Sequence, residues 1–269
     1  MKIFCLKKIV LILYIPILFS NFSYSFSQIK GYHKKHTKNN SNTKINHNKD
    51  AINFYREGLK LLKERNYEES LYYFDEAIKL NDKFANAYNS KGDTLSKLGK
   101  YDEAILFHNK AIDIDKDNPL FYNNKGEVLI KQNNLEEAIE CFNIALKKNK
   151  SFVNSYNNLA NAFTILGDYN KAIKYANKSI SLSKEEPYGY FYKARALDIM
   201  GNKELALKEY DNAINYNKRY INGYYYKMLL LLELSKTDEA TTCLNILIDI
   251  DPINEENYNN IFNEKKGSD

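Results

Sequence analysis

Residues 119–152 read PLFYNNKGEVLIKQNNLEEAIECFNIALKKNKSF, and this stretch contains the pattern that decides the fold. Its landmarks are an aromatic residue, a small residue, a large apolar residue and two alanines: Tyr122, Gly126, Leu129, Ala138 and Ala145. Spacings of three, four and seven residues place such side chains on one face of a helix. Between the two halves lies the pair Asn133-Asn134, and Asn just past a helix end tolerates the left-handed conformation that stops it. The stretch therefore predicts two helices joined by a short turn.

The same landmarks recur along the chain with a period of 34 residues. The aromatic residue recurs at Phe54, Tyr88, Tyr122, Tyr156, Tyr190, Tyr224 and Tyr258. The small residue recurs at Gly58, Gly92, Gly126, Ala160 and Ala194. Turn residues recur at Gly99, Asn133, Gly167 and Gly201. A fixed period of this length is typical of helix-turn-helix solenoids, in which one repeat cannot bury its apolar face without its neighbours.

These residues make the chain resemble the tetratricopeptide repeat family, whose pattern places an aromatic residue, a Leu-Gly pair, Tyr, Ala, Phe and Pro in order. The resemblance covers six repeats without an insertion, at 51–84, 85–118, 119–152, 153–186, 187–220 and 221–254. It implies an all-α fold, a right-handed α-solenoid of six helix-turn-helix repeats over residues 51–254, followed by a capping helix and tail at 255–269. Repeat 6 departs from the pattern, because Met228 and Leu247 replace small residues and put its close packing in question.

Composition supports a helical, globular body. The chain has 269 residues, of which 44% are hydrophobic and 27% charged, so neither disorder nor a multi-span membrane protein describes the whole. Ten Gly and four Pro are too few for an all-β fold, which needs frequent turns.

The net charge of +5 is concentrated at the N-terminus. Residues 1–50 hold nine lysines and one acid, Asp50, whereas residues 51–269 hold 30 basic and 33 acidic residues. Nucleic-acid binders need a basic face that neutralises phosphates. A mildly acidic body, whose groove nearly lacks cations, excludes nucleic acid as the expected partner.

The first 25 residues are typical of an export signal. Lys2, Lys7 and Lys8 precede an apolar run at residues 9–19, which is too short to span a bilayer, and we expect cleavage after Ser25. The alternative is an uncleaved anchor. After cleavage we expect no membrane span.

Residues 26–50 have no acid before Asp50 and are rich in Lys, Asn and Ser, so we expect a basic disordered spacer or a transit segment. The spacer reading predicts export through the secretory route to a periplasm, an envelope or the exterior. The transit reading predicts a plastid-type organelle reached with a two-part leader. Mapping the mature N-terminus by mass spectrometry separates the two.

The body offers no catalytic constellation, and we expect no catalytic, cofactor-binding or metal-binding residues. His108 occupies the slot of Phe74 and Phe142 in sister repeats, so a core-filling role is expected. Cys141 and Cys243 lie three repeats apart, too far for a disulfide, and are expected to pack as small apolar side chains.

The resemblance implies a concave groove lined mainly by the first helix of each repeat, at repeat positions 2, 5, 6, 9, 12 and 13. We call these positions the groove face. Its middle is rich in amides: Asn86, Asn89, Asn123, Asn124, Asn154, Asn157, Asn158 and Asn161. Because an Asn side chain both donates and accepts hydrogen bonds, a ladder of them can pair with the backbone of an extended peptide. The alternative is that these asparagines bind no peptide and only reflect the frequency of Asn in this Asn-rich chain and in the family.

Tyrosines crowd the groove face of repeats 5 and 6, namely Tyr188, Tyr192, Tyr225 and Tyr226. Tyr is favoured at interfaces, so they are candidate partner contacts, although a cap or self-association could cover them.

The sequence thus predicts a non-catalytic protein–protein interaction scaffold that holds an extended peptide segment or subunit of unknown identity. The alternative is a structural assembly factor of an envelope or organelle complex, docked by its convex face or its Tyr-rich end. The slots of the clamp that holds chaperone C-terminal tails contain no cation here, and Asp93 and Glu127 would repel a carboxylate, so such tails are not expected partners. Homo-oligomers stay possible.

Overall fold

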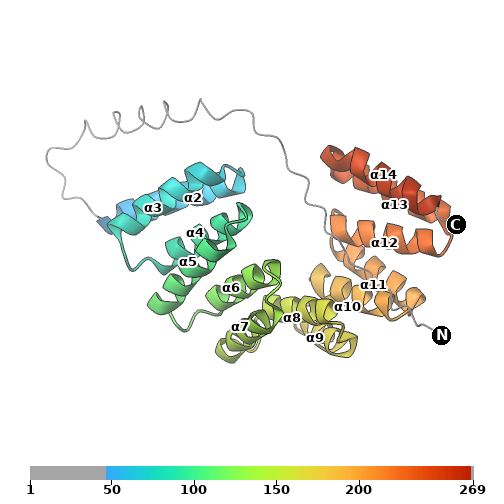
Figure 1. Cartoon of the computed structure of the whole chain (residues 1–269), viewed down its shortest axis with the longest axis horizontal. Coiled ribbons are helices and arrows are strands. Elements are labelled where there is room, and N and C mark those ends of the chain that lie inside the picture. Colours follow the sequence, from blue (N-terminus) through green and yellow to red (C-terminus); the bar gives the residue numbers. More distant parts are fainter. Residues whose placement is uncertain (1–46, 268–269) are drawn as a thin grey trace, which may run out of the picture. The chain divides into compact units, whose positions relative to one another are not determined.

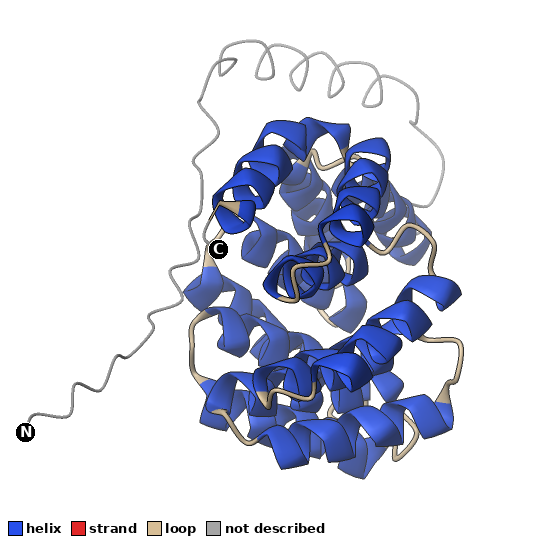
Figure 2. Cartoon of the chain, turned by 90° about the vertical axis from the view of Figure 1, so that its right-hand side faces the viewer, coloured by secondary structure: helices blue, strands red, loops and turns tan. Residues whose placement is uncertain are grey.

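The computed structural model describes residues 47–267, and helices account for almost all of them (Figure 1). In chain order the helices are α2 (His47–Lys63), α3 (Tyr67–Leu80), α4 (Ala85–Lys97), α5 (Tyr101–Ile114), α6 (Pro119–Lys131), α7 (Leu135–Lys148), α8 (Val153–Leu166), α9 (Tyr169–Leu182), α10 (Pro187–Ile199), α11 (Lys203–Tyr216), α12 (Ile221–Glu233), α13 (Thr237–Ile250) and α14 (Glu255–Lys266). A short 3₁₀ turn, Pro252–Asn254, joins the last two. Within this range Figure 2 shows helices and loops and no strand.

The predicted export signal lies outside the described residues, as does most of the spacer or transit segment at 26–50. Helix α2 nevertheless begins at His47, ahead of the predicted start of repeat 1 at residue 51. Asp50 lies in the first turn, where a carboxylate interacts favourably with the helix dipole. Asn48 accepts a hydrogen bond from Asn81 Nδ2 at 3.0 Å. The end of the basic segment is therefore part of the first repeat.

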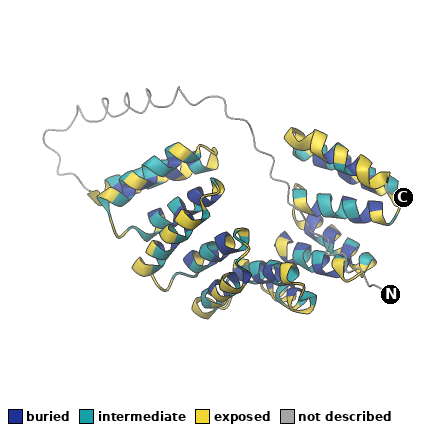
Figure 3. Cartoon of the chain, viewed as in Figure 1, coloured by how far each residue is buried: buried dark blue, intermediate teal, exposed yellow. Residues whose placement is uncertain are grey.

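The helices pack in pairs that follow the predicted repeats. The even-numbered helices α2 to α12 are the first helices, and the odd-numbered helices α3 to α13 are the second helices. Each first helix contacts the second helix of its own repeat and the second helix of the preceding one. Buried residues face these contacts, and exposed residues lie on the outside (Figure 3). The predicted all-α solenoid is confirmed.

Close packing inside a repeat depends on a small residue facing a large one. A Cβ added at Gly126 would lie 2.5 Å from Cε1 of Phe142, and one added at Gly58 would lie 2.6 Å from Cε1 of Phe74. Such distances are far below van der Waals contact, so the ring fills the space that glycine leaves. Both rings are fully buried. The small landmark therefore lets the two helices of a hairpin cross closely.

The recurring aromatic landmark connects each first helix to its surroundings. Tyr122 Oη donates to the carbonyl oxygen of Lys116 at 3.2 Å, and Tyr156 Oη donates to that of Lys150 at 3.1 Å. The Tyr156 ring also lies 6.4 Å from that of Tyr175 on the second helix. In repeats 3 and 4 the side chain therefore holds the loop before the repeat.

The turn between the two helices uses one conformation in all six repeats. The residue at the same repeat position has positive φ each time: Arg65, Gly99, Asn133, Gly167, Gly201 and Ser235. Four of these were predicted from the sequence as turn residues. Arg65 and Ser235 adopt the same conformation although they have a Cβ, because the hairpin geometry requires it.

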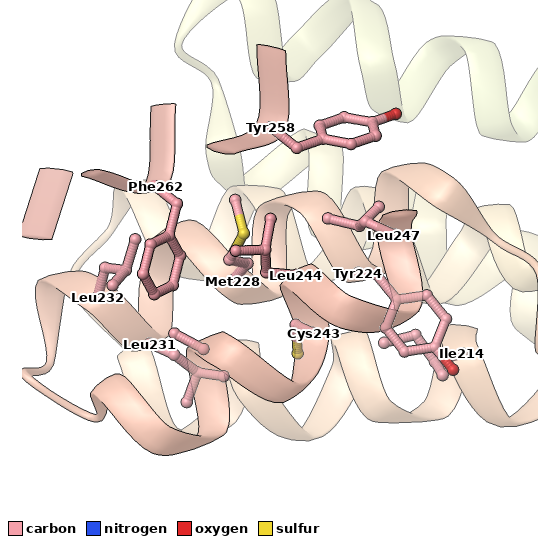
Figure 4. Packing of buried hydrophobic residues seen from close by; sticks show 11 residues of the cluster. Ile214, Tyr224, Met228, Leu231, Leu232, Cys243, Leu244, Leu247, Tyr258 and Phe262 are labelled. Carbon is pink, nitrogen blue, oxygen red and sulfur yellow. The ribbon is translucent and has the colours of Figure 1, made fainter. Parts of the chain in front are cut away.

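Repeat 6 is closely packed, contrary to the prediction drawn from its large residues. Met228 and Leu247 are both fully buried in one cluster, beneath Tyr258 and Phe262 of α14 (Figure 4). The helix that follows repeat 6, α14, covers them, and Leu244 of α13 belongs to the same cluster.

The positive φ of the turn residue predicts opposite changes in stability for two substitutions. Gly201→Ala should lower the free energy of unfolding by about 1 kcal/mol, because its φ of 82° strains any residue with a Cβ. Nothing lies within 4 Å of the added Cβ, so conformation alone is tested. Ser235→Gly should raise stability by a similar amount, because it relieves the same strain. Urea unfolding followed by circular dichroism measures both, and shifts of equal sign would contradict the explanation.

Candidate functional site

A cavity of about 500 Å³ opens on the groove face of repeats 1 to 3. Its lining comes from the ends of three first helices and the turn after the first of them: Leu62, Lys63, Arg65, Tyr67, Asp93, Ser96, Lys97, Asn124, Glu127, Val128 and Lys131. Asn124 is among the predicted site residues. The cavity thus places polar groups from successive repeats next to one another.

Two clusters of amides around a carboxylate join consecutive first helices beside this cavity. In the first cluster, Asn89 Nδ2 donates to Asp93 Oδ2 at 3.2 Å, and Asn124 Nδ2 donates to Asp93 Oδ1 at 3.0 Å. The second cluster repeats this arrangement 34 residues later. Glu127 Oε1 accepts from Asn123 Nδ2 at 2.8 Å and from Asn158 Nδ2 at 2.9 Å. We call both arrangements amide–carboxylate clusters.

Position 5 does not offer an open ladder of amides, which corrects the sequence-based expectation. Asn89, Asn123 and Asn157 are only 5%, 1% and 4% exposed. Asn123 Oδ1 accepts hydrogen bonds from Ser155 Oγ and Asn158 Nδ2, both at 3.0 Å. A side chain four residues from a carboxylate on the same helix face is positioned to bond it, so these amides are used inside the protein.

The remaining predicted asparagines differ in exposure. Asn86 and Asn154, at position 2, are exposed, whereas Asn124, Asn158 and Asn161 are half-buried. Asn124 and Asn158 use their amide groups in the amide–carboxylate clusters. The position 2 amides are therefore more open to a partner than Asn124 and Asn158, whose amide groups already make internal hydrogen bonds.

His108 occupies the core slot that the sequence predicted. The ring is fully buried against Gly92, and its Nδ1 lies 3.1 Å from Asn89 Oδ1. Its Nε2 has no hydrogen-bond partner among the described residues and lies 3.7 Å from Asp93 Oδ1. Burial, followed by repulsion from Lys125, lowers the pKa of His108 to about 4. The imidazole is thus neutral near pH 7.

Asp93 lies between His108 and the cavity. Burial, followed by repulsion from Glu127, raises the pKa of Asp93 to about 7, against the opposing hydrogen bond from Asn124. The carboxyl is therefore partly protonated at neutral pH.

The cavity contains cations that the sequence reasoning missed. Lys63, Lys97 and Lys131 come from the same position of three successive repeats, and Arg65 lies beside them. Lys131 Nζ donates to Ser96 Oγ at 2.8 Å. The expectation of a groove nearly without cations is therefore wrong for repeats 1 to 3. The sequence contained a signal for these cations, because a lysine recurs at position 13 of three successive repeats.

The predicted tyrosines of repeats 5 and 6 mostly pack on one another. Tyr225 and Tyr226 meet edge to face with ring centroids 5.2 Å apart, and Tyr225 also lies 6.3 Å from Tyr258 of α14. Burial raises the pKa of Tyr192 to about 12. Tyr188 is the exposed one, with its ring edge-on to Tyr220. The cap thus covers part of this surface and leaves Tyr188 accessible.

Residues 47–267 offer little further chemistry outside these clusters. In that range no group of three or more His, Cys, Asp or Glu could hold a metal ion. Cys141 and Cys243 are buried free thiols, and burial raises the pKa of both. Every described helix is too short or too polar to cross a bilayer.

The buried amides generate a stability prediction. Asn123→Ala should lower the free energy of unfolding by about 1–3 kcal/mol, because it leaves the buried Ser155 hydroxyl and one acceptor site of Glu127 without their partner. Asn86→Ala is the matched control and should change stability by less than about 0.5 kcal/mol, because Asn86 is exposed. The urea midpoint of unfolding measures the stability of each variant. Equal midpoints for the two variants would contradict the structural role of Asn123.

His108 generates a pH prediction. Its pKa falls from 6.5 in the unfolded chain to about 4 in the folded protein, so the unfolded chain binds more protons between these values and stability is lost as pH falls through this window. His108→Phe removes that loss, and Phe fits the slot as Phe142 does against Gly126. The variant should therefore gain stability relative to the unsubstituted protein between pH 7 and pH 4.

Comparing both proteins at each pH removes the contribution of Asp93, whose raised pKa acts in the opposite direction and destabilises the fold as pH rises from about 4 to 7. Urea midpoints at several pH values measure the difference. A difference that stays constant with pH would contradict a neutral buried imidazole.

Comparison with known proteins agrees with this architecture. Residues 92–133 and 126–167 match a family described as TPR repeat, and residues 73–106 and 151–225 match families described as tetratricopeptide repeat. No curated protein matches the sequence.

Several solved structures share the fold at low sequence identity. A tetratricopeptide repeat protein from Parabacteroides merdae is 16% identical, with a TM-score of 0.72 over 89% of this chain and 90% of that one. PilF of Pseudomonas aeruginosa is 18% identical, with a TM-score of 0.63 over 79% of this chain and 98% of that one.

A chain of the APC/C hetero-tetramer Cut9-Hcn1 is 18% identical, with a TM-score of 0.70 over 82% of this chain. The match covers 44% of that chain, so this protein spans less than half of its length. Such identities show the fold alone. The 34-residue period, the paired helices and the matched residues together show that the chain belongs to the tetratricopeptide repeat family.

Proposed function

We propose that this protein is a non-catalytic scaffold that holds an extended segment of a partner protein on its groove face. Proteins of this family are typically protein–protein interaction scaffolds and generally non-catalytic. The observation that carries the proposal is the cavity of about 500 Å³, because it lies where three successive first helices present polar and charged side chains. An extended chain crossing several repeats would meet such groups at regular intervals.

The open positions differ from those that the sequence suggested. The buried amides Asn89, Asn123 and Asn157 maintain the contacts between helices, so recognition falls to exposed groups such as Asn86, Asn154 and Tyr188. We also propose that chaperone C-terminal tails are not partners, because the slots of the clamp that holds such tails contain no cation in this chain.

The alternative function is a structural assembly factor docked by the convex face or by the Tyr-rich end. Partial coverage of Tyr225 by α14 reduces the surface available at that end. Export from the cytosol, through the secretory route or into a plastid-type organelle, stays a prediction of the N-terminal sequence.

Site-specific photo-cross-linking in the native source tests the proposal. A photoreactive amino acid replaces Asn86, Asn154 or Tyr188, which share position 2 of three repeats and are exposed. We expect mass spectrometry to identify one contiguous segment of one partner at all three positions, because an extended chain on the groove face passes each of them.

Matched controls carry the same amino acid on second helices, at the exposed residues Glu140, Lys174 and Lys208. These sites should give no cross-link to that segment. Cross-links confined to the control sites would refute binding on the groove face and favour the assembly factor.

A further inference from the structure

Six side chains at position 13 form a row along one edge of the groove face. We call this the position-13 row: Lys63, Lys97, Lys131, Ile165, Ile199 and Glu233. All six are exposed, and each lies in the last turn of a first helix. Consecutive first helices contact one another from α2 to α12. The row therefore runs across all six repeats, changing from basic to apolar and ending in an acid.

The basic half of the row has no counter-ion of its own. Within residues 47–267, Lys63, Lys97 and Lys131 have no carboxylate within ion-pair distance. All three line the cavity together with Arg65. Desolvation, followed by repulsion from Lys97, lowers the pKa of Lys131. An anionic group placed among these lysines would relieve that repulsion.

Asp93 and Glu127 also line the cavity, but they already accept hydrogen bonds within the protein. The oxygens of Asp93 and Glu127 accept hydrogen bonds from the amides of the amide–carboxylate clusters. They therefore form the polar floor of the cavity, whereas the lysines lie at its edge without a direct ion pair to another described residue, Lys131 donating one hydrogen bond to Ser96 Oγ.

The apolar half of the row is a second contact surface. Ile165 is 50% exposed and Ile199 is 47% exposed, and each is followed by another exposed apolar residue, Leu166 and Met200. A cation is favoured near any helix C-terminus by the helix dipole, yet these two helices end in apolar side chains instead. Contiguous exposed apolar side chains mark interaction surfaces.

The spacing of the first helices predicts the spacing of side chains in a segment bound to the row. Packed helices lie about 8–10 Å apart, and an extended chain in the polyproline II conformation rises about 3.1 Å per residue with three residues per turn. Side chains three residues apart therefore lie on one face of the partner and span about one repeat. We propose that the position-13 row binds an extended protein segment in which acidic side chains, about three residues apart, are followed by two apolar side chains at the same spacing. This inference rests on the proposed function and names the chemistry of its partner. The apolar half and the acidic floor favour a protein over a nucleic acid.

Synthetic peptides test the pattern with the full chain. Two fluorescent peptides, acetylated and amidated, carry three Asp and then two Leu at every third position, with Ser and Gly between, in opposite chain directions. Amidation removes the terminal carboxylate, so only side chains are tested. We expect one of the two to bind in fluorescence anisotropy, and its affinity to fall with added salt.

Two variants separate the halves of the row. Lys63→Gln/Lys97→Gln/Lys131→Gln should weaken binding at least tenfold and flatten the salt dependence. Its matched control, Lys147→Gln/Lys174→Gln/Lys208→Gln, makes the same charge change at exposed lysines of second helices and should leave affinity within twofold. Ile165→Asn/Ile199→Asn should weaken binding severalfold with the salt dependence unchanged. Circular dichroism confirms that each variant is folded.

The inference is overturned if neither peptide binds, or if a peptide with Asn in place of Asp binds equally well. It is also overturned if the two triple lysine variants have the same affinity. Tighter binding of a single-stranded oligonucleotide through the same lysines would overturn it as well. Photo-cross-linking at Asn86, Asn154 and Tyr188 depends on none of these outcomes. Failure of the position-13 row is thus distinguishable from failure of the proposed function.

Discussion

The close crossing of the two helices in each repeat is the contact on which the rest of the structure depends. Glycine at positions such as 58 and 126 admits a whole aromatic ring from the second helix, so the helix axes approach and the apolar side chains interdigitate. Where the landmark residue becomes Met228, its side chain packs in one cluster with Tyr258 and Phe262 of α14.

Polar groups buried beside this core have become part of the packing. The amides of Asn89 and Asn123 bond a carboxylate one turn away, and the next repeat supplies a second amide to the same carboxylate. The side-chain amides of Asn89 and Asn123 therefore have partners, as buried polar groups generally require. The cost is that these asparagines cannot also pair with the backbone of a bound peptide. Recognition is displaced toward side chains farther out on the groove face.

Charge is distributed along the groove face unevenly. The basic half of the position-13 row lies beside the amide–carboxylate clusters, and the apolar half lies near the packed tyrosines and Arg195, whose guanidinium stacks on Tyr226 at 3.8 Å. A surface that changes from polar to apolar along its length can select a partner segment by order as well as by composition. The row begins at Lys63 and ends at Glu233, which forms an ion pair with Lys203.

The sequence by itself determined the repeat fold, because helical periodicity, small-residue crossings and turn residues recur in register and depend only on local spacing. It also placed His108 in the core, whereas the positions of the groove face came from the resemblance to the tetratricopeptide repeat family. Only the tertiary structure decided that Asn89, Asn123 and Asn157 are buried, since their partners on other helices lie up to 35 residues away along the chain. It likewise decided that three lysines share one cavity. Local spacing sets which face a side chain occupies, but burial and electrostatic environment depend on the neighbouring repeats that pack against that face.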